Sequence, residues 1–296
     1  MKLALLLTGG TILSKKQSDF YTLSDSAEKE ILSLIPSGIE AEVFSPYFIL
    51  SEQLDGDYLT RLIDFVGDKL KQNYDGIVIL HGTDTLQFSA AALSLAYGNA
   101  DIPIVLVSSN YVLSDKRSNG RDNLRYALRF IEKKIGGVFV SYRNTDEKPS
   151  IFLGSSLLPH LPYSDRLYST CGKYGYFDKD NFVNLVGEPS LDSIGKFTLT
   201  KDSPVLWIKA SPGMKLTSSR EYKAVLLEAY HSGTLPTEND SFINFCKDCN
   251  KPIYVTGVSK GTQYSSTKSF DNLGLKTLPE ASPVFAYISL WQRYSE

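Results

Sequence analysis

Two short segments of this 296-residue chain combine threonine hydroxyls with glycines directly after an apolar run. Residues 8–12 read Thr-Gly-Gly-Thr-Ile and follow the run at 3–7, while residues 81–85 read His-Gly-Thr-Asp-Thr and follow the run at 76–80. Glycine tolerates a positive φ and a close approach of backbones, so a neighbouring hydroxyl can be presented beside free backbone N–H groups. Such segments could bind an oxyanion or supply a nucleophilic hydroxyl, provided that a neighbouring group activates it.

Each segment also has a purely structural interpretation. A Thr-Gly-Gly-Thr sequence after a strand is often only a turn, and Thr83 or Asp84 at the start of a helix is most often an N-cap. Residues 8–12 match neither of the glycine-rich phosphate-binding patterns, so we exclude a nucleotide-phosphate site of those two types. The presence of two such segments favours a functional site over two unrelated turns, because turns at the carboxyl ends of strands in one parallel sheet converge on one crevice. There Asp84 would add a carboxylate able to hold an ammonium group or orient a water.

The pattern of apolar residues predicts the elements that position these turns. Four runs without polar alternation indicate strands covered on both faces, as in a parallel sheet: residues 3–7, 76–80, 103–107 and 137–140. Between them, residues 84–98 and 122–134 carry apolar side chains at helical spacing. Strands that alternate with amphipathic helices predict an α/β architecture.

Composition predicts two domains. Residues 185–202 are rich in glycine, proline and serine, which is typical of an exposed connection. We therefore expect an N-terminal domain over 1–184, a linker over 185–202 and a smaller α/β domain over 203–296. The last contains strand-like runs and one helix candidate near residues 242–247.

Charge and cysteine content narrow the classes of partner and compartment. The 31 Lys and Arg against 33 Asp and Glu give a net charge of −2, spread along the chain, so we expect no nucleic-acid or membrane surface.

Three cysteines argue against a disulfide-stapled secreted fold, and the first apolar run is too short for a signal peptide, so we expect a cytoplasmic protein. The three histidines lack metal-ligand spacing, and we expect no metal; His81 is interpreted as orienting the backbone of its turn.

These residues carry a resemblance to a known family. Residues 8–12 and 81–85 resemble the two signature segments of the bacterial-type L-asparaginase and glutaminase family. Residues 108–124, which end in Gly-x-x-Asn-Leu, and the pair Ser51-Glu52 are similar to two further segments of that family. The resemblance covers the first domain and, more weakly, the second. It implies a larger, flavodoxin-like N-terminal parallel sheet with a smaller α/β C-terminal domain, a homodimer or homotetramer, and no cofactor.

The resemblance also implies catalytic roles. Thr11 would be the nucleophile that attacks the side-chain amide of L-asparagine, or of a related amide, and releases ammonia. Tyr21 would be its hydrogen-bonded activator, although a surface aromatic in a polar loop is an equal alternative. Thr83 would be the second catalytic hydroxyl, beside Asp84.

The same family pattern implies the substrate-binding groups for a small zwitterionic amino-acid amide. Asp84 and Glu52 would bind its α-ammonium group, and Ser51 would meet its α-carboxylate. Gly10 and Thr83 would complete the substrate-binding set, with nearby backbone N–H groups stabilising the oxyanion.

Two segments depart from the family pattern. The family supplies a lysine for proton transfer beside the second threonine, but residues 157–166 contain none. Arg166 stays protonated and could hold charge without shuttling a proton, whereas His160 could replace part of the lysine's role. Pro159 and Pro162 indicate a rebuilt loop.

The second departure lies at residues 230–236, where a family asparagine that reaches a neighbouring subunit is missing. Two alternatives to an asparaginase therefore stay open. One is a catalytically impaired relative that binds an amino acid or amide, and the other is an amidohydrolase for a different or larger amide.

Overall fold

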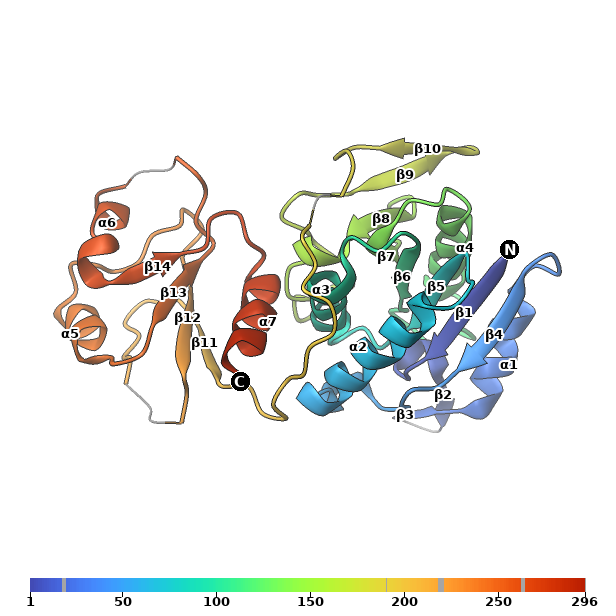
Figure 1. The fold of residues 1–296 in the computed structure, drawn as a ribbon, viewed down its shortest axis with the longest axis horizontal. Coiled ribbons are helices and arrows are strands. Elements are labelled where there is room, and N and C mark those ends of the chain that lie inside the picture. Colours follow the sequence, from blue (N-terminus) through green and yellow to red (C-terminus); the bar gives the residue numbers. More distant parts are fainter. Residues whose placement is uncertain (18–19, 190, 218–220, 262–263, 296) are drawn as a thin grey trace. The chain divides into compact units, whose positions relative to one another are not determined.

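The computed structural model describes residues 1–17, 20–189, 191–217, 221–261 and 264–295, apart from the side chains of residues 16, 17, 20, 21, 25 and 26. The chain divides into two compact units, Met1–Phe197 and Thr198–Glu296 (Figure 1). The division falls within the segment 185–202 that we expected to be the linker. Its first part is held to the N-terminal unit, because the Ile194 N–H donates to the Leu95 carbonyl at 3.0 Å and Lys196 pairs with Asp68 at 2.9 Å.

An eight-stranded sheet forms the centre of the N-terminal unit, in the order β10-β9-β8-β7-β6-β5-β1-β4. Five of its strands are mutually parallel, and three add to one edge in antiparallel fashion. The parallel strands are β1 (Lys2–Leu7), β4 (Glu40–Phe44), β5 (Gly76–Leu80), β6 (Pro103–Val107) and β7 (Gly137–Tyr142); the others are β8 (Ser150–Leu153), β9 (Gly175–Asp178) and β10 (Asn181–Asn184). The four predicted strands of this sheet are confirmed, and every residue of β5, β6 and β7 is buried.

The order of the parallel strands fixes where a ligand can bind. Counted along the chain, the five parallel strands have the spatial order 2-1-3-4-5, which is the flavodoxin-like arrangement. The chain runs outward from β1 to β4 and then crosses back to β5 on the other side of β1. In such a sheet the crevice opens where this reversal occurs, at the carboxyl ends of β1 and β5.

Helices cover both faces of this sheet (Figure 1). One face buries Leu5, Val78 and Val105 against Ile31 and Leu124 of two helices, α1 and α4. Helices α2 and α3 pack together on the other face. The helix bounds are α1 (Asp25–Ser33), α2 (Gly56–Leu70), α3 (Leu86–Tyr97) and α4 (Gly120–Ile131). Both helices that the sequence predicted for this unit are therefore confirmed, with their ends shifted by a few residues.

Short elements complete the N-terminal unit. A separate antiparallel pair, β2 (Ser14–Gln17) and β3 (Phe20–Leu23), follows the first turn, where the sequence indicated only a polar loop. Three 3-10 turns lie near the ends of strands: η1 (Thr11–Leu13), η2 (Ser51–Gln53) and η3 (Gly154–Ser156).

The C-terminal unit is a smaller α/β layer structure. Its four strands are all parallel, in the order β11-β12-β13-β14. Their bounds are β11 (Val205–Lys209), β12 (Ala224–Glu228), β13 (Ile253–Thr256) and β14 (Leu275–Thr277), and the remaining elements are α5 (Asp240–Asp248), α6 (Ser265–Lys268), η4 (Asp271–Leu273) and α7 (Pro283–Tyr294). The predicted two-domain α/β fold is therefore confirmed.

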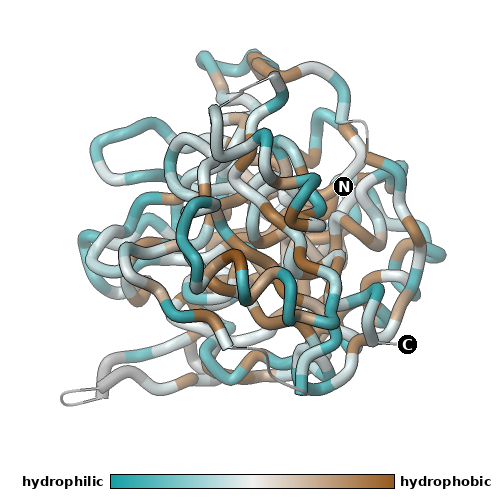
Figure 2. Tube along the Cα trace, turned by 90° about the vertical axis from the view of Figure 1, so that its left-hand side faces the viewer, coloured by the Kyte–Doolittle hydropathy of each residue, from teal (hydrophilic) through white to brown (hydrophobic). Residues whose placement is uncertain are grey.

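Hydrophobic stretches run through the inside of the trace, and hydrophilic residues occupy many peripheral loops (Figure 2). In the C-terminal unit, Leu227 and Val255 of the sheet pack with Phe242 and Phe245 of α5. Within the described ranges, every helix is too short or too polar to cross a bilayer.

Candidate active site

The two threonine-containing turns leave the sheet side by side. Strands β1 and β5 are neighbours, with Leu7 paired to Leu80. Directly beyond them, the backbone N–H and the hydroxyl of Thr8 both donate to the Leu80 carbonyl, at 3.1 and 2.8 Å. These two bonds tie the first turn to the end of β5. The prediction that both turns converge on one crevice is therefore confirmed.

Glycines bring the backbones of these turns into contact. Gly10 has φ +78° and ψ −176°, a region almost restricted to glycine. A Cβ atom on Gly10 would lie 2.1 Å from the Cα of Gly82, and a Cβ on Gly82 would lie 2.3 Å from the Cβ of Ser51. The segment after β1, the segment after β5 and the turn η2 are thus packed so closely that a side chain at Gly10 or Gly82 would clash.

This stacking places Ser51 beside Asp84. The Ser51 side chain is buried, and its hydroxyl lies 3.5 Å from a carboxylate oxygen of Asp84. The hydroxyl of Thr85 donates to the Ser51 carbonyl at 2.9 Å and links the two segments again. Glu52, the next residue, is exposed on the same turn.

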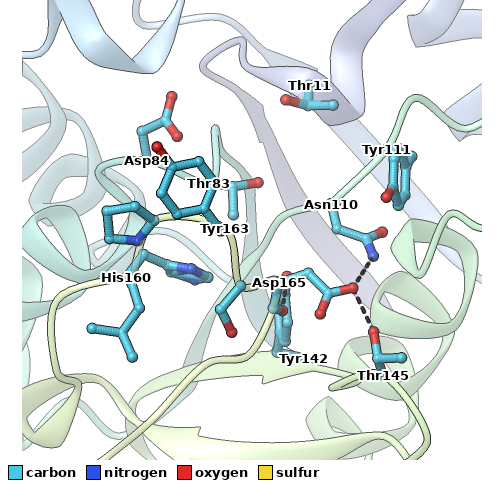
Figure 3. Close-up of a pocket in the computed structure, with 13 residues that line it drawn as sticks. Thr11, Thr83, Asp84, Asn110, Tyr111, Tyr142, Thr145, His160, Tyr163 and Asp165 are labelled. Carbon is cyan, nitrogen blue, oxygen red and sulfur yellow. Dashed lines mark hydrogen bonds between the residues drawn. The ribbon is translucent and has the colours of Figure 1, made fainter.

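A cavity of about 770 Å³ opens above the turns, and Thr11, Thr83 and Asp84 line it (Figure 3). Three predicted site residues therefore meet in one cavity, with Gly10 packed behind them. Ser51 and Glu52 are not part of the lining in the described region. The backbone of Tyr21 pairs with residue 16 in the β2–β3 sheet, but its side chain lies outside the described residues, so its predicted role stays a prediction.

The two threonine hydroxyls differ in what they contact. The Thr83 hydroxyl donates to the Ser109 carbonyl at 2.8 Å, so its proton is held and its lone pairs are left for the cavity. Thr11 is half-buried at the start of η1. Its hydroxyl has no hydrogen-bond partner within the part of the chain that the structure describes. Both threonines line the cavity, and of the two hydroxyls it is that of Thr83 that is held by another described residue.

Sequence reasoning missed the opposite wall of the cavity. There Asn110 donates to a carboxylate oxygen of Asp165 at 3.0 Å, and the Thr145 hydroxyl donates to the same oxygen. These bonds lower the pKa of Asp165, the Thr145 bond most strongly. The Tyr142 hydroxyl donates to the Asp165 carbonyl at 2.9 Å, and burial raises the pKa of Tyr142 to about 12.

Asn110 is fixed from behind as well. Its side-chain oxygen accepts from the Asn119 N–H, and its own N–H donates to the Asn119 side chain, both at 3.0 Å. Both asparagines lie in the segment 108–124 that resembled the family, which was the available signal. Asp165 had none, because its partner Asn110 is 55 residues away in the chain.

His81 supports the second turn from below. Its Nδ1 atom lies 2.8 Å from the Gly82 carbonyl, and its Nε2 atom lies 2.8 Å from the Ser89 hydroxyl. Because the ring is fully buried, its pKa is lowered to about 4, so the neutral ring donates to the carbonyl and accepts from Ser89. The interpretation of His81 as an orienting residue is confirmed.

The cavity carries acidic and polar groups without a basic counterpart. Among its described lining residues there is no lysine or arginine, and Arg166 instead pairs with Glu147 at 2.9 Å. Over the same described ranges, no group of three potential metal ligands occurs. His160 does line the cavity, on the side of Thr83 and Asp84 in Figure 3.

Comparisons with known proteins show which family and fold this chain is similar to. The family model described as "Asparaginase, N-terminal" matches residues 2–157. The L-asparaginase of Thermococcus kodakarensis is 29% identical over 276 residues, which cover 86% of this chain and 80% of that protein. A glutamyl-tRNA(Gln) amidotransferase subunit from Methanosarcina acetivorans is 29% identical over 277 residues, covering 86% of this chain and 64%, less than two thirds, of that protein. L-asparaginase I from Vibrio cholerae has the same fold, with a TM-score of 0.81 over 100% of this chain and 93% of that chain at 21% identity.

The stacking of glycines predicts a stability difference between two alanine substitutions. Gly10→Ala and Gly172→Ala both force alanine to a positive φ, +78° and +71°, but only Gly10 lacks room for a Cβ atom. We expect Gly172→Ala to lower the free energy of unfolding by about 1 kcal/mol, and Gly10→Ala by a further 1–3 kcal/mol or so. Urea denaturation measures both, and equal losses would contradict the close approach of the turns.

The buried His81 ring predicts loss of stability in acid. Its folded pKa of about 4 lies below the unfolded value of about 6.5, so the unfolded state binds the proton first. The stabilisation is complete above pH 6.5 and is lost as the pH falls toward 4. Between pH 7 and pH 4.5 we expect His81 to account for a loss of about 2–3 kcal/mol.

Denaturation at the two pH values tests this expectation against His81→Gln. The variant lacks the titrating ring, and its unfolding free energy should fall less than that of the wild type over the same interval. An equal fall in both proteins would show that carboxylates alone cause the acid sensitivity.

Proposed function

Because the chain belongs to the asparaginase family, we propose that this member hydrolyses the side-chain amide of L-asparagine to L-aspartate and ammonia. Family membership and the asparaginase relatives support an amidohydrolase. One observation carries the narrower proposal: Thr11 and Thr83 face one cavity from two turns, with the Asp84 carboxylate between the second turn and Ser51. No cofactor takes part in the proposed reaction.

The proposed reaction has two halves. In the first, the Thr11 hydroxyl oxygen attacks the amide carbon, and the C–N bond breaks with release of ammonia. This leaves an ester between Thr11 and the aspartyl group. In the second, a water attacks the ester carbon, the bond to the Thr11 oxygen breaks, and aspartate leaves while Thr11 recovers its proton. Tyr21 remains the proposed activator of Thr11 in the first half.

The carboxylates near η2 fit the α-ammonium group of an amino acid. Asp84 is a carboxylate at the cavity wall, and we assign the substrate ammonium group to it. We assign the α-carboxylate of the substrate to the Ser51 hydroxyl. This hydroxyl lies 3.5 Å from a carboxylate oxygen of Asp84, so the two α-groups of one amino acid would bind side by side. Glu52 and Gly10 stay in the proposed substrate-binding set: Glu52 as a second carboxylate for the ammonium group, and Gly10 beside the nucleophile.

Assembly and location belong to the proposal too. We propose a homodimer or a homotetramer, in line with the family resemblance, and a cytoplasmic location, in line with the cysteine content. The substrate alone is the expected small-molecule partner.

The cavity itself favours a second candidate substrate class. Its volume of about 770 Å³ is in the range of about 300–1,000 Å³ typical of sites for drug-sized ligands, whereas asparagine is a much smaller molecule. Leu161, Pro162 and Tyr163 form an exposed rim on it. A larger amide, with an apolar group placed against this rim, is therefore the alternative substrate.

Ammonia release from a panel of amides tests the proposal. The panel contains asparagine, glutamine and β-amides of aspartate that carry apolar N-substituents, for which the released amine is measured instead. We expect wild-type turnover of asparagine and a loss of about 10³-fold or more in Thr11→Ala, since the variant lacks the attacking oxygen. Thr277→Ala, at an exposed position of β14, is the matched control and should turn over like the wild type.

The possible outcomes separate the candidate functions. Turnover that is fastest with the substituted amides would favour the larger substrate. Turnover that survives Thr11→Ala would remove Thr11 as nucleophile. No release from any amide, together with a rise of the melting temperature in aspartate, would contradict the enzyme and favour a binding protein.

A further inference from the structure

The second half of the proposed reaction needs a group that takes a proton from water. A water molecule is a weak nucleophile until a positioned base removes its proton during the attack. The cavity offers few such bases in its described lining: two carboxylates and one imidazole. Asp165 already accepts hydrogen bonds from Asn110 and Thr145. Asp84 is assigned to the substrate ammonium group. His160 is the base that has no other role.

The backbone around His160 is held in place. The Leu158 N–H donates to the Tyr168 carbonyl at 2.9 Å, and Leu157 forms a β-bridge with Ser169. These bonds fix the start of the loop 157–166 against its end. The ring itself lies edge-on to the Tyr142 ring, with 6.0 Å between the centroids. His160 thus enters the cavity from a backbone anchored two residues before it.

The two ring nitrogens of His160 have different surroundings. Nε2 is buried and has no hydrogen-bond partner within the described residues. Because His160 lines the cavity and its Nε2 atom is closed off from solvent, we assign the ligand side of the ring to Nδ1. His81 makes the contrast clear, because both of its nitrogens are engaged. A neutral ring that keeps its proton on Nε2 presents the Nδ1 lone pair to a ligand.

Burial lowers the pKa of His160, and the charges that face the ring raise it by a smaller amount. Asp84, after β5, and Asp165, on the same loop, both favour the imidazolium form, while Tyr142 of β7 is uncharged at neutral pH. Burial is the larger effect, and the pKa of His160 lies below the ordinary histidine value. The ring is therefore neutral at neutral pH, which is the form that accepts a proton.

We propose that His160 is the base for the hydrolytic water of this site. The inference rests on the proposed threonine-ester mechanism. The water, held by the free lone pairs of Thr83, gives a proton to Nδ1 as its oxygen bonds to the ester carbon. The bond from that carbon to the Thr11 oxygen then breaks, and the imidazolium returns the proton to that oxygen. Aspartate leaves, and both His160 and Thr11 are restored.

Rapid-mixing kinetics of His160→Gln test this assignment. Glutamine keeps a polar side chain of similar length but cannot accept the proton. We expect an initial burst of ammonia that is stoichiometric with enzyme, followed by a steady state about 10²–10⁴-fold slower than in the wild type. The melting temperature of the variant shows whether it is folded.

The pH profile and chemical rescue supply readouts that a structural role would not move. Wild-type kcat should fall in acid as His160 becomes protonated, with a midpoint below pH 6.5, the ordinary value for histidine. His160→Gln should lack this limb. Added imidazole should restore turnover to His160→Ala, and it should leave Thr11→Ala inactive.

The outcomes distinguish this inference from the function on which it rests. If the wild type releases no ammonia from any amide, the proposed function fails and the inference fails with it. If the wild type turns over while folded His160→Gln keeps its kcat and its acid limb, only the inference is overturned. Loss of the burst along with the steady state would overturn it as well, because the defect would then lie in the first half.

Discussion

The contact between two glycine backbones at the carboxyl ends of β1 and β5 is the constraint on which the site depends. A Cβ atom on Gly10 would clash with Gly82, and a Cβ atom on Gly82 would clash with Ser51. Without these contacts, the turns could not bring Thr11, Thr83 and Asp84 to one cavity. The reversal of strand order between β1 and β5 puts the contact where a parallel sheet opens a crevice. The strand order and the glycine contact therefore place the candidate site at the same backbone positions.

Some polar groups around this contact hold the turns in place, and others line the cavity. His81 and Thr8 form hydrogen bonds that hold the two turns, and a neutral buried ring serves this purpose better than a charged one. On the far wall, Asp165 is held by Asn110 and Thr145, which fixes its charge in place. The Thr83 hydroxyl donates to a backbone carbonyl and keeps its lone pairs for the cavity that it lines. This division would let a chain with a net charge of −2 hold both charges of the proposed zwitterionic substrate.

Much of the fold was predictable from sequence because the central strands are buried on both faces. Residues 76–80 and 103–107 show no polar alternation, and each forms a fully buried strand. The convergence of the turns was expected because the two Thr-Gly motifs each follow a buried strand of one parallel sheet. Polar or short elements gave no such signal. The β2–β3 pair is built of residues such as Ser14 and Lys15, and β8–β10 are four-residue strands that pair in antiparallel fashion.

The far wall of the site could not be predicted for a different reason. The partnership of Asp165 with Asn110 joins positions 55 residues apart, and neither residue type demands the other. Helix α7 was not among the predicted elements, although its start has a local signal: Ser282 caps it and Pro283 occupies its first turn. Local chemistry predicts elements, whereas pairings across the fold need the structure.

Direct detection of the threonine ester tests the central claim most sharply. Wild-type protein mixed with asparagine is quenched in acid within the first turnover, digested, and examined by mass spectrometry. The proposed mechanism predicts that the peptide containing Thr11 gains the mass of one aspartyl group and that Thr11 carries it. An aspartyl group on another residue, or its absence from every peptide while ammonia is released, would contradict it.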